Sequence, residues 1–291
     1  MRRTTVVAVT AAIAVVSTVG VGRSASEVTN GATQLRTSAL PAFDPARFDG
    51  SATVDNRWLP FEPGMQFVFT GHSKDGRKRL IFTVTDLVKT VAGVRNVVIW
   101  DRDYTEGELV EAELAFFAQD NDGNVWHTGE YPEEYEGGKV VNSPAWIAGV
   151  KGAKAGIEMQ AEPRAGSPSY AQGYAPPPVN WTDRAQVFKM GQATCVPFSC
   201  FGDVLITREY NADEPGRFQL KYYVPGVGNV RVGWMGASDT DREVLVLTKL
   251  VQLGPEALAN VRAEALKLER RAYRTKRNVY GGTPPSESAQ G

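Results

Sequence analysis

The sequence has few of the side chains on which many catalytic and metal sites depend. Its 291 residues include two cysteines, Cys195 and Cys200, and two histidines, His72 and His127. It contains no HExxH, G-x-S-x-G or C-x-x-C motif and no phosphate-binding glycine loop. A Ser-His-Asp triad would have to use one of the two histidines. The sequence therefore predicts no metal site and no cofactor.

Positive charge is also scarce in the body of the chain. Residues 26–253 carry 22 basic and 29 acidic side chains, a net charge of −7, whereas residues 254–291 carry seven basic and four acidic ones. Nucleic acid is bound mainly through Lys and Arg contacts to phosphate, so an acidic body argues against a nucleic-acid partner. A small molecule is the partner that we expect, and the sequence does not specify an oligomeric state.

Residues 1–25 have the pattern of an export signal. Met1, Arg2 and Arg3 form a basic start, residues 4–22 form an uncharged and mostly apolar run, and small residues near Ala25 offer a cleavage site. A retained membrane anchor is the alternative, although polar residues interrupt the run. We therefore expect a secreted or extracytoplasmic (cell envelope) protein with no stable membrane span after signal cleavage.

Export gives the two cysteines a simple interpretation. Cys195 and Cys200 flank a Pro-containing turn in the sequence CVPFSC, and an oxidising compartment favours a disulfide at this spacing. The alternatives are a metal pair and a reactive thiol, but the chain has no further cysteine and neither histidine is near in sequence. The prediction is a disulfide.

Residues 58–253 have the pattern of antiparallel β-structure. Runs rich in apolar residues are separated by short glycine turns such as Lys74-Asp75-Gly76. About ten strands joined in this way predict an up-and-down sheet that is strongly curved or closed into a barrel. The predicted fold class is therefore mainly β and antiparallel, with residues 26–57 as an exposed leader in front of the β domain.

The segment 142–178 differs from the rest of this domain. Its glycines alternate with prolines, and it ends in three consecutive prolines, so little continuous strand is expected. Long irregular segments in compact domains are often lids or binding loops, and Trp146, Ile147 and Met159 could close over a cavity. A loop fixed to the surface by Trp146 is the alternative.

The end of the chain predicts one C-terminal α-helix over residues 254–280. Gly254, Pro255 and Glu256 supply an N-cap, a proline at the first helical position and an acid in the first turn. An apolar stripe follows at spacings of three and four residues: Leu258, Val261, Ala265, Leu268 and Ala272. We expect it to pack across the sheet or over a barrel mouth, with a membrane-surface or oligomerising helix as the alternative. Residues 281–291 are expected to be a disordered tail.

The stretch 94–130 contains two predicted hairpins and most of the candidate site residues. Gly107 and Gly123 fit three-residue loops, which would pair Asp101 with Glu111 and Phe117 with His127. Side chains alternate along a strand, which gives a core face and a mixed face. The mixed face combines carboxylates and a histidine with apolar side chains: Ile99, Asp101, Asp103, Leu109, Glu111, Glu113, Phe117, Gln119, Val125 and His127.

The mixed face has two physical explanations. It is either the solvated side of a half-buried sheet or the lining of a cavity in which Asp101 and Glu111 share a ligand, a cation or a proton. Like charges directly opposite each other destabilise a sheet by up to about 1 kcal/mol, so a dry face would need a partner for them. We favour the solvated side because carboxylates are costly to bury.

Several motifs occur in an order that resembles a known group of proteins. They are GELVE at 107–111, FAQDNDGNVW at 117–126, AGVKGAKAGI at 148–157, EPG at 214–216 and KYYVPGVG at 221–228. Over about residues 55–230 the chain resembles an exported bacterial β-rich family without an established activity. The resemblance assigns no catalytic residue, and the chain departs from the family pattern at Ala115, His127 and Gly173.

Three functions fit these features. The first, which we predict, is a secreted β-barrel-like protein that binds a small, partly apolar ligand. Its candidate ligand-binding residues are Ile99, Leu109, Phe117, Trp146 and Tyr223. The second is an extracytoplasmic enzyme, hydrolase- or isomerase-like, that uses a carboxylate pair as general acid and base. Its candidate catalytic residues are Asp101, Glu111, Glu113 and His127. The third is a cell-surface structural or interaction protein.

Overall fold

The computed structural model describes residues 37–50, 52–211, 213, 216–236 and 242–289. It also describes two short strands, β1 (Val7–Ala8) and β2 (Ala12–Ile13), which pair with each other. Apart from these two strands, the predicted signal peptide (1–25) and the first part of the predicted leader lie outside the described residues.

The described chain is mainly β. Ten strands have eight or more residues: β3 (Met65–Ser73), β4 (Gly76–Val91), β5 (Val94–Thr105), β6 (Glu108–Gln119), β7 (Val125–Glu136), β13 (Asp183–Cys195), β14 (Cys200–Asn211), β15 (Arg217–Val224), β16 (Gly228–Gly236) and β17 (Glu243–Gln252). Six shorter strands raise the total in the sheet to 16: β8 (Lys139–Asn142), β9 (Trp146–Ile147), β10 (Lys154–Met159), β11 (Tyr170–Ala171), β12 (Gly173–Tyr174) and β18 (Glu287–Ser288). The sheet therefore has more strands than the ten that were predicted, because short segments join it.

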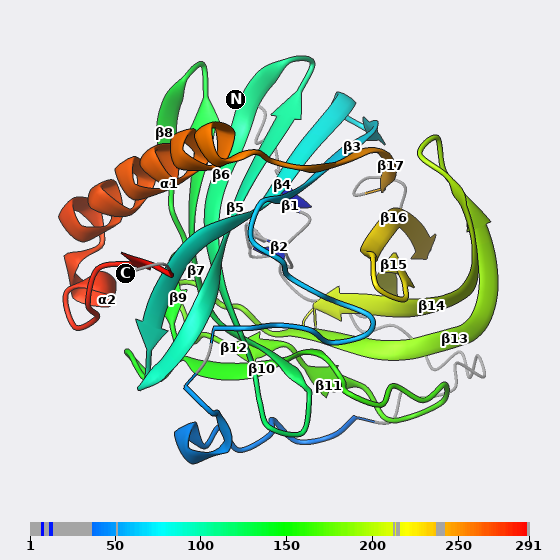
Figure 1. Cartoon of the computed structure of the whole chain (residues 1–291), viewed down its shortest axis with the longest axis horizontal. Helices are drawn as coiled ribbons and strands as arrows, with labels where there is room; N and C mark the ends of the chain where they lie inside the picture. The colour runs from blue at the N-terminus through cyan, green and yellow to red at the C-terminus, as the bar shows by residue number, and fades with distance from the viewer. Residues whose placement is uncertain are drawn as a thin grey trace, which may run out of the picture.

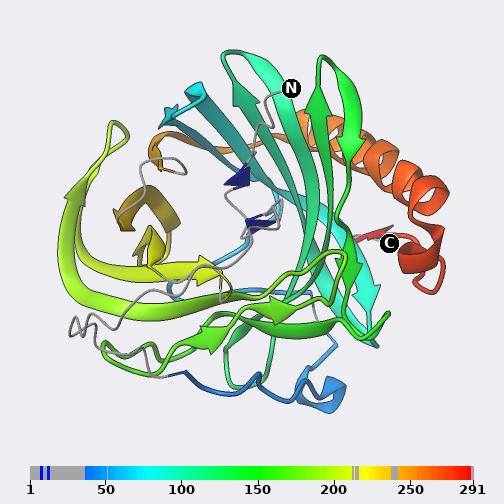
Figure 2. The same ribbon diagram turned by 180° about the vertical axis from the view of Figure 1, so that it is seen from behind.

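The strands form one antiparallel sheet that curves into a nearly closed barrel (Figure 1, Figure 2). Neighbours in the sheet follow chain order from β3 to β7 and from β13 to β17. β17 then pairs with β3, so residues 243–252 lie beside residues 65–73. The predicted fold class, a mainly β antiparallel barrel-like sheet with a C-terminal helix, is confirmed.

The segment 142–178 completes the barrel, whereas the sequence predicted an irregular Gly/Pro-rich loop, either a lid or a surface loop. β10 pairs with β7, β11 pairs with β13, and β12 pairs with β10. The chain is close-packed at this joint, since a Cβ atom on Gly156 would lie 2.3 Å from the backbone nitrogen of Gly173. Trp146, Ile147 and Met159 are buried. Very short paired stretches between glycines and prolines have no strand-like periodicity, which explains the different expectation.

The apolar outer face of the sheet lies under the C-terminal helix. α1 (Pro255–Thr275) crosses the outside of β4 and β6 (Figure 1). Four of the five residues of the predicted stripe are buried there: Val261, Ala265, Leu268 and Ala272. Of these, Ala265, Leu268 and Ala272 belong to the same core cluster as Leu114 and Phe116 of β6. None of the helices formed by the described residues is long and apolar enough to cross a membrane.

A buried ion pair fixes the C-terminal segment to the sheet. Lys89 Nζ of β4 lies 2.9 Å from Glu269 Oε1 of α1, and it donates further hydrogen bonds to Tyr273 Oη and the carbonyl oxygen of Pro284. After the short helix α2 (Arg277–Tyr280), β18 pairs with β4. Residues 281–289 therefore differ from the disordered tail that was expected, because these contacts hold them against the sheet.

Residues 52–64 form a plug segment inside the barrel. Val54 and Phe61 pair in a β-bridge, and both pack in the inner core cluster with Phe117 of β6. Asn56 stabilises the turn between them, since its Oδ1 accepts a hydrogen bond from the backbone nitrogen of Trp58 at 2.8 Å. Val54 and Asn56 are buried, so the end of the predicted exposed leader is part of the packed structure.

Cys195 and Cys200 form the predicted disulfide at the tip of the β13–β14 hairpin. The tip packs back onto the barrel, because Val196 is buried and the backbone nitrogen of Phe198 donates a hydrogen bond to the carbonyl oxygen of Leu247 at 3.2 Å. The disulfide thus closes the tip of a hairpin, and this tip also contacts β17. The prediction of a disulfide is confirmed.

Candidate ligand-binding site

The predicted register is right for one of the two hairpins in the stretch 94–130 and wrong for the other. In the second hairpin Phe117 pairs with His127, as the loop length predicted. In the first hairpin Asp101 pairs with Glu113, so the predicted pairing of Asp101 with Glu111 is wrong. The shift is two residues, which leaves all three carboxylates on one face of the sheet.

The turn of the first hairpin explains the shift. Its two central residues, Glu106 and Gly107, have φ angles of 51° and 88°, as in a type I′ turn rather than a three-residue loop. A bulge then follows between Asp103 and Tyr104. Because the bulge changes the alternation of side chains, Leu109 packs with the outer cluster under the helix and not on the mixed face.

The mixed face is the inner wall of the barrel, so the preference for a solvated face is wrong. Asp101, Asp103, Glu111 and Glu113 are 3%, 2%, 5% and 0% exposed. Curvature of the whole sheet encloses this face, and local sequence patterns carry no information on that curvature. We call these four residues the acid cluster.

A buried lysine supplies positive charge to the acid cluster. Lys78 of β4 forms an ion pair with Asp103, and its Nζ lies 3.5 Å from Glu243 Oε1. Burial raises the pKa of Asp101 to about 8, and the charge of Asp103 adds to this shift. Burial also raises the pKa of Glu243 to about 8 and that of Asp103 to about 6, although Lys78 opposes both shifts. Several of these acids therefore keep a proton at neutral pH.

His127 is surrounded by aromatic side chains and does not contact Lys78. Its ring stacks on Phe117 with 4.7 Å between centroids and contacts Trp146 and Trp181 at 5.0 and 5.3 Å. Burial lowers the pKa of His127 to about 3, so the imidazole is neutral at neutral pH. Its Nε2 lies 3.7 Å from Glu130 Oε2, and burial raises the pKa of Glu130 well above its usual value.

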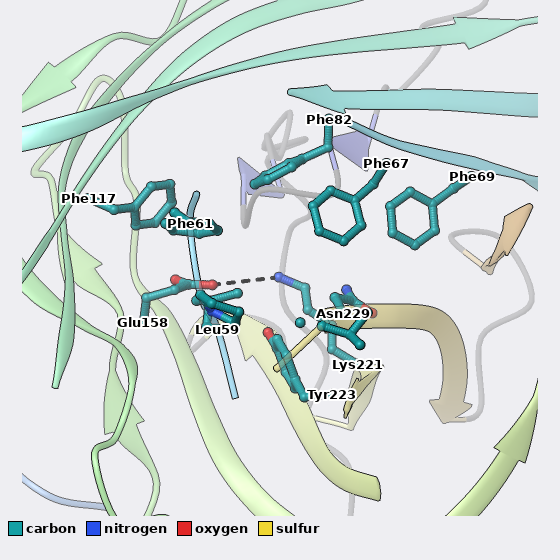
Figure 3. Close-up of a pocket in the computed structure, with 13 residues that line it drawn as sticks. Leu59, Phe61, Phe67, Phe69, Phe82, Phe117, Glu158, Lys221, Tyr223 and Asn229 are labelled. Carbon is teal, nitrogen blue, oxygen red and sulfur yellow. Dashed lines mark ion pairs between the residues drawn. The ribbon is translucent and has the colours of Figure 1, made fainter. Parts of the chain in front are cut away.

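A pocket opens on the inner wall between the plug segment, β3, β4 and the β15–β16 turn. One side of it is an aromatic wall in which neighbouring ring centroids lie 5.2–6.4 Å apart (Figure 3). The aromatic wall consists of Phe61, Phe67, Phe69, Phe82 and Phe117. These rings come from four separate segments, and the curvature of the barrel brings them together.

The opposite side of the pocket is polar. Lys221 Nζ of β15 lies 2.7 Å from Glu209 Oε2 and 3.9 Å from Glu158 Oε1 (Figure 3). Tyr223 donates a hydrogen bond to Glu209 at 3.3 Å, and Gln172 donates one to Glu158 at 3.1 Å. We call these five residues the Lys221 network. It places charged groups across the pocket from the aromatic wall.

The charges of the Lys221 network follow from burial and from one another. Burial lowers the pKa of Lys221, but Glu209 and Glu158 raise it and the net shift is upward, so the amine is protonated. Burial raises the pKa of Glu158 to about 7, against the opposing effect of Lys221. Glu158 therefore changes its charge near neutral pH.

The pocket is compact. The centres of water molecules can occupy about 50 Å³ of it, which is room for several waters or for part of a small ligand. Leu59 and Pro60 of the plug segment and Gly228 and Asn229 of β16 also line it. A larger ligand would require one of these two segments to move.

The structure brings together some of the predicted ligand-binding residues. Phe117 and Tyr223 line the pocket, and Ile99 lies in the same inner core cluster without lining it. Trp146 packs against Trp181, with 5.1 Å between the ring centroids, and Leu109 lies on the outer face. The candidate catalytic residues Asp101, Glu111, Glu113 and His127 do not line this pocket.

Sequence reasoning missed Lys221, Glu158 and most of the aromatic wall. The sequence could have predicted Lys221, because it is two residues before Tyr223 and alternation places both on one face of a strand. Glu158 lies in a segment that was expected to be irregular. Within the described part of the chain, no group of His, Cys, Asp and Glu side chains has an arrangement that could hold a metal ion.

Comparisons with known proteins give distant structural similarity. No protein-family model and no curated protein matches the chain. A putative exported protein with a YmcC-like fold from Bacteroides fragilis shares 14% identity, with a TM-score of 0.38 over 67% of this chain and 99% of that one. A putative lipoprotein from Parabacteroides distasonis shares 15% identity, with a TM-score of 0.39 over 69% of this chain and all of that one. Similarity this distant assigns neither a family nor an activity.

Proposed function

We propose that the protein is an extracytoplasmic barrel that binds a small, partly apolar ligand between the aromatic wall and the Lys221 network. The observation that carries this proposal is the pocket itself, in which apolar rings face a few convergent polar groups. Ligand sites typically combine an apolar lining with a small number of polar groups that fix orientation. Of the predicted ligand-binding residues, Phe117 belongs to the aromatic wall and Tyr223 to the Lys221 network.

Two sequence features support a location outside the cytoplasm. The first 25 residues have the pattern of an export signal. The disulfide between Cys195 and Cys200 suits an oxidising compartment. The resemblance of several motifs to those of an exported bacterial β-rich family agrees with this location.

Native mass spectrometry of the protein purified from its own host tests the proposal directly. We expect a bound small molecule that denaturation releases. Titration with a neutral fluorescent probe, N-phenyl-1-naphthylamine, measures occupancy of the pocket in the purified protein. A protein with no bound molecule and no saturable binding of the probe would contradict the proposal.

Phe117 and Phe116 provide a matched pair of variants for the probe titration. They are neighbours on β6 and both are buried, but Phe117 lines the pocket and Phe116 packs in the outer cluster. We expect Phe117→Leu to lower the affinity for the probe by about fivefold and Phe116→Leu to leave this affinity unchanged. Equal effects of the two substitutions would show that the probe binds elsewhere.

A second function, an enzyme that uses the acid cluster, is favoured by one observation. Asp101 and Glu113 lie directly opposite each other on buried strands, and burial raises the pKa of Asp101 to about 8, which is a range suited to general acid catalysis. Turnover on a panel of sugars, esters and lactones is the test. Activity that survives unchanged in Asp101→Asn and Glu113→Gln would exclude these roles.

A further inference from the structure

The Lys221 network contains one more carboxylate than its lysine neutralises. Glu209 is the closer partner of Lys221, at 2.7 Å, and its other oxygen accepts hydrogen bonds from Thr207 at 3.0 Å and Tyr223 at 3.3 Å. Through these three contacts both oxygens of Glu209 have a cationic or hydrogen-bonding partner. Glu209 therefore neutralises most of the charge of Lys221.

Glu158 is the carboxylate that remains. Its Oε2 accepts one hydrogen bond, from Gln172, and its Oε1 lies 3.9 Å from Lys221 Nζ, beyond hydrogen-bond distance. Glu158 lines the pocket and is 6% exposed. A carboxylate this buried stays ionised only where a positive charge compensates it, and otherwise takes up a proton.

The aromatic wall faces this carboxylate across the pocket (Figure 3). The faces of aromatic rings attract cations, and desolvation strengthens that attraction. An anionic ligand would instead meet Glu158 and Glu209 together, with Lys221 already paired. The two sides of the pocket therefore favour the same sign of ligand charge.

We propose that the ligand is a small organic cation, an amine or alkylammonium with an apolar body, whose charged group pairs with Glu158 while its body packs on the aromatic wall. This inference rests on the proposed binding function and adds the charge of the ligand. With the cation bound, Lys221 and the ligand together neutralise Glu209 and Glu158. Without it, Glu158 is protonated in a large fraction of molecules at neutral pH.

The affinity for a cation should depend on pH. Burial raises the pKa of Glu158 to about 7, so a cation binds more weakly below pH 7, where it must displace the proton. The titratable groups that interact with Glu158 are Lys221, Glu209, Glu130, Asp183, Tyr170 and Tyr223. Burial raises the pKa of Glu130 and Asp183 well above the usual range, which favours their neutral forms.

Three probes with the same six-carbon chain separate charge from apolar binding: hexylammonium, 1-hexanol and hexanoate. Calorimetric titration of the full protein at pH 8 should give an affinity for hexylammonium about tenfold above that for 1-hexanol, with hexanoate the weakest. The advantage of hexylammonium over 1-hexanol should shrink at pH 6. Equal affinities for hexylammonium and 1-hexanol, or tighter binding of hexanoate, would overturn the inference and leave the proposed function in place.

Glu158→Gln removes the proposed partner of the cation. This variant should lose the tenfold preference for hexylammonium and retain its affinity for 1-hexanol, which also shows that it is folded. Glu243→Gln is the matched control, because Glu243 is also buried in the barrel interior but does not line the pocket. An unchanged preference in Glu158→Gln would overturn the inference. Failure of all three probes to bind the unmodified protein would overturn both proposals.

Discussion

Asp101 of β5 lies directly opposite Glu113 of β6 on the inner wall of the barrel. Burial raises the pKa of Asp101 to about 8. It also raises the pKa of Glu243, whose Oε1 lies 3.5 Å from Lys78 Nζ, to about 8. Between about pH 4 and pH 8 the folded protein therefore holds protons that the unfolded chain has released. Stability is highest at the acidic end of this window and falls as the pH rises.

The first prediction is that the free energy of unfolding is larger at pH 5 than at pH 8. Each such group contributes a slope of about 1.4 kcal/mol per pH unit within its window. Asp101→Asn keeps the shape of the side chain and should flatten the slope by roughly this amount. Asp75→Asn, in an exposed turn, is the control and should change nothing. Guanidinium unfolding at four pH values measures the effect, and a stability that rises with pH would contradict it.

The second prediction concerns the attachment of the C-terminal helix. Lys89→Met should cost roughly 3–5 kcal/mol, because it leaves Glu269 buried without its cation. The double variant Lys89→Met/Glu269→Met should be more stable than the single one. Lys267→Met removes an exposed pair with Glu264 and should cost less than about 1 kcal/mol. Urea unfolding of the four proteins decides between this interpretation and a helix that contributes little.

The third prediction concerns the joint that closes the barrel. Gly156→Ala should destabilise the fold by several kcal/mol or prevent folding, since the new methyl group would meet the backbone of Gly173. Gly202→Ala is the matched control, because that glycine is also in a strand and its Cβ would meet nothing within 4 Å. Thermal unfolding followed by circular dichroism should show a large loss for the first variant and a change below about 1 kcal/mol for the second.

The fourth prediction concerns the hairpin tip. Reduction of the Cys195–Cys200 disulfide should cost about 2 kcal/mol in the chain-entropy model for a loop of this length. Hydrogen exchange should then increase at Phe198, whose backbone nitrogen bonds to β17, more than in the middle of β14. The variant Cys195→Ser/Cys200→Ser should behave like the reduced protein. An unchanged melting temperature on reduction would contradict the prediction.

The sequence predicted the features that depend on local patterns. The strand class, the stripe of α1, the disulfide and the pairing of Phe117 with His127 all follow from residues close together in the chain. The register of the first hairpin was not predictable in the same way, because Gly107 fits both a three-residue loop and the observed two-residue turn with a bulge.

The pocket depends on long-range geometry and was predicted only in part. Its residues come from the plug segment, β3, β4, β6, β10, β15 and β16, which are adjacent only after the barrel curves. The burial of Asp101 and Glu111 has the same origin. Alternation shows which side chains share a face, but it does not show which face is enclosed, so a polar inner wall has the same pattern as a wet outer one.

The pairing of β3 with β17 has a consequence for biogenesis. The first long strand of the barrel, β3, can pair early with β4, but its other neighbour, β17, is complete only when the ribosome has made residue 252. Contacts of such large sequence separation delay folding, since a long loop must be ordered before they form. For the export that we propose, this delay is an advantage, because the barrel stays open and the chain can be translocated until synthesis is nearly complete.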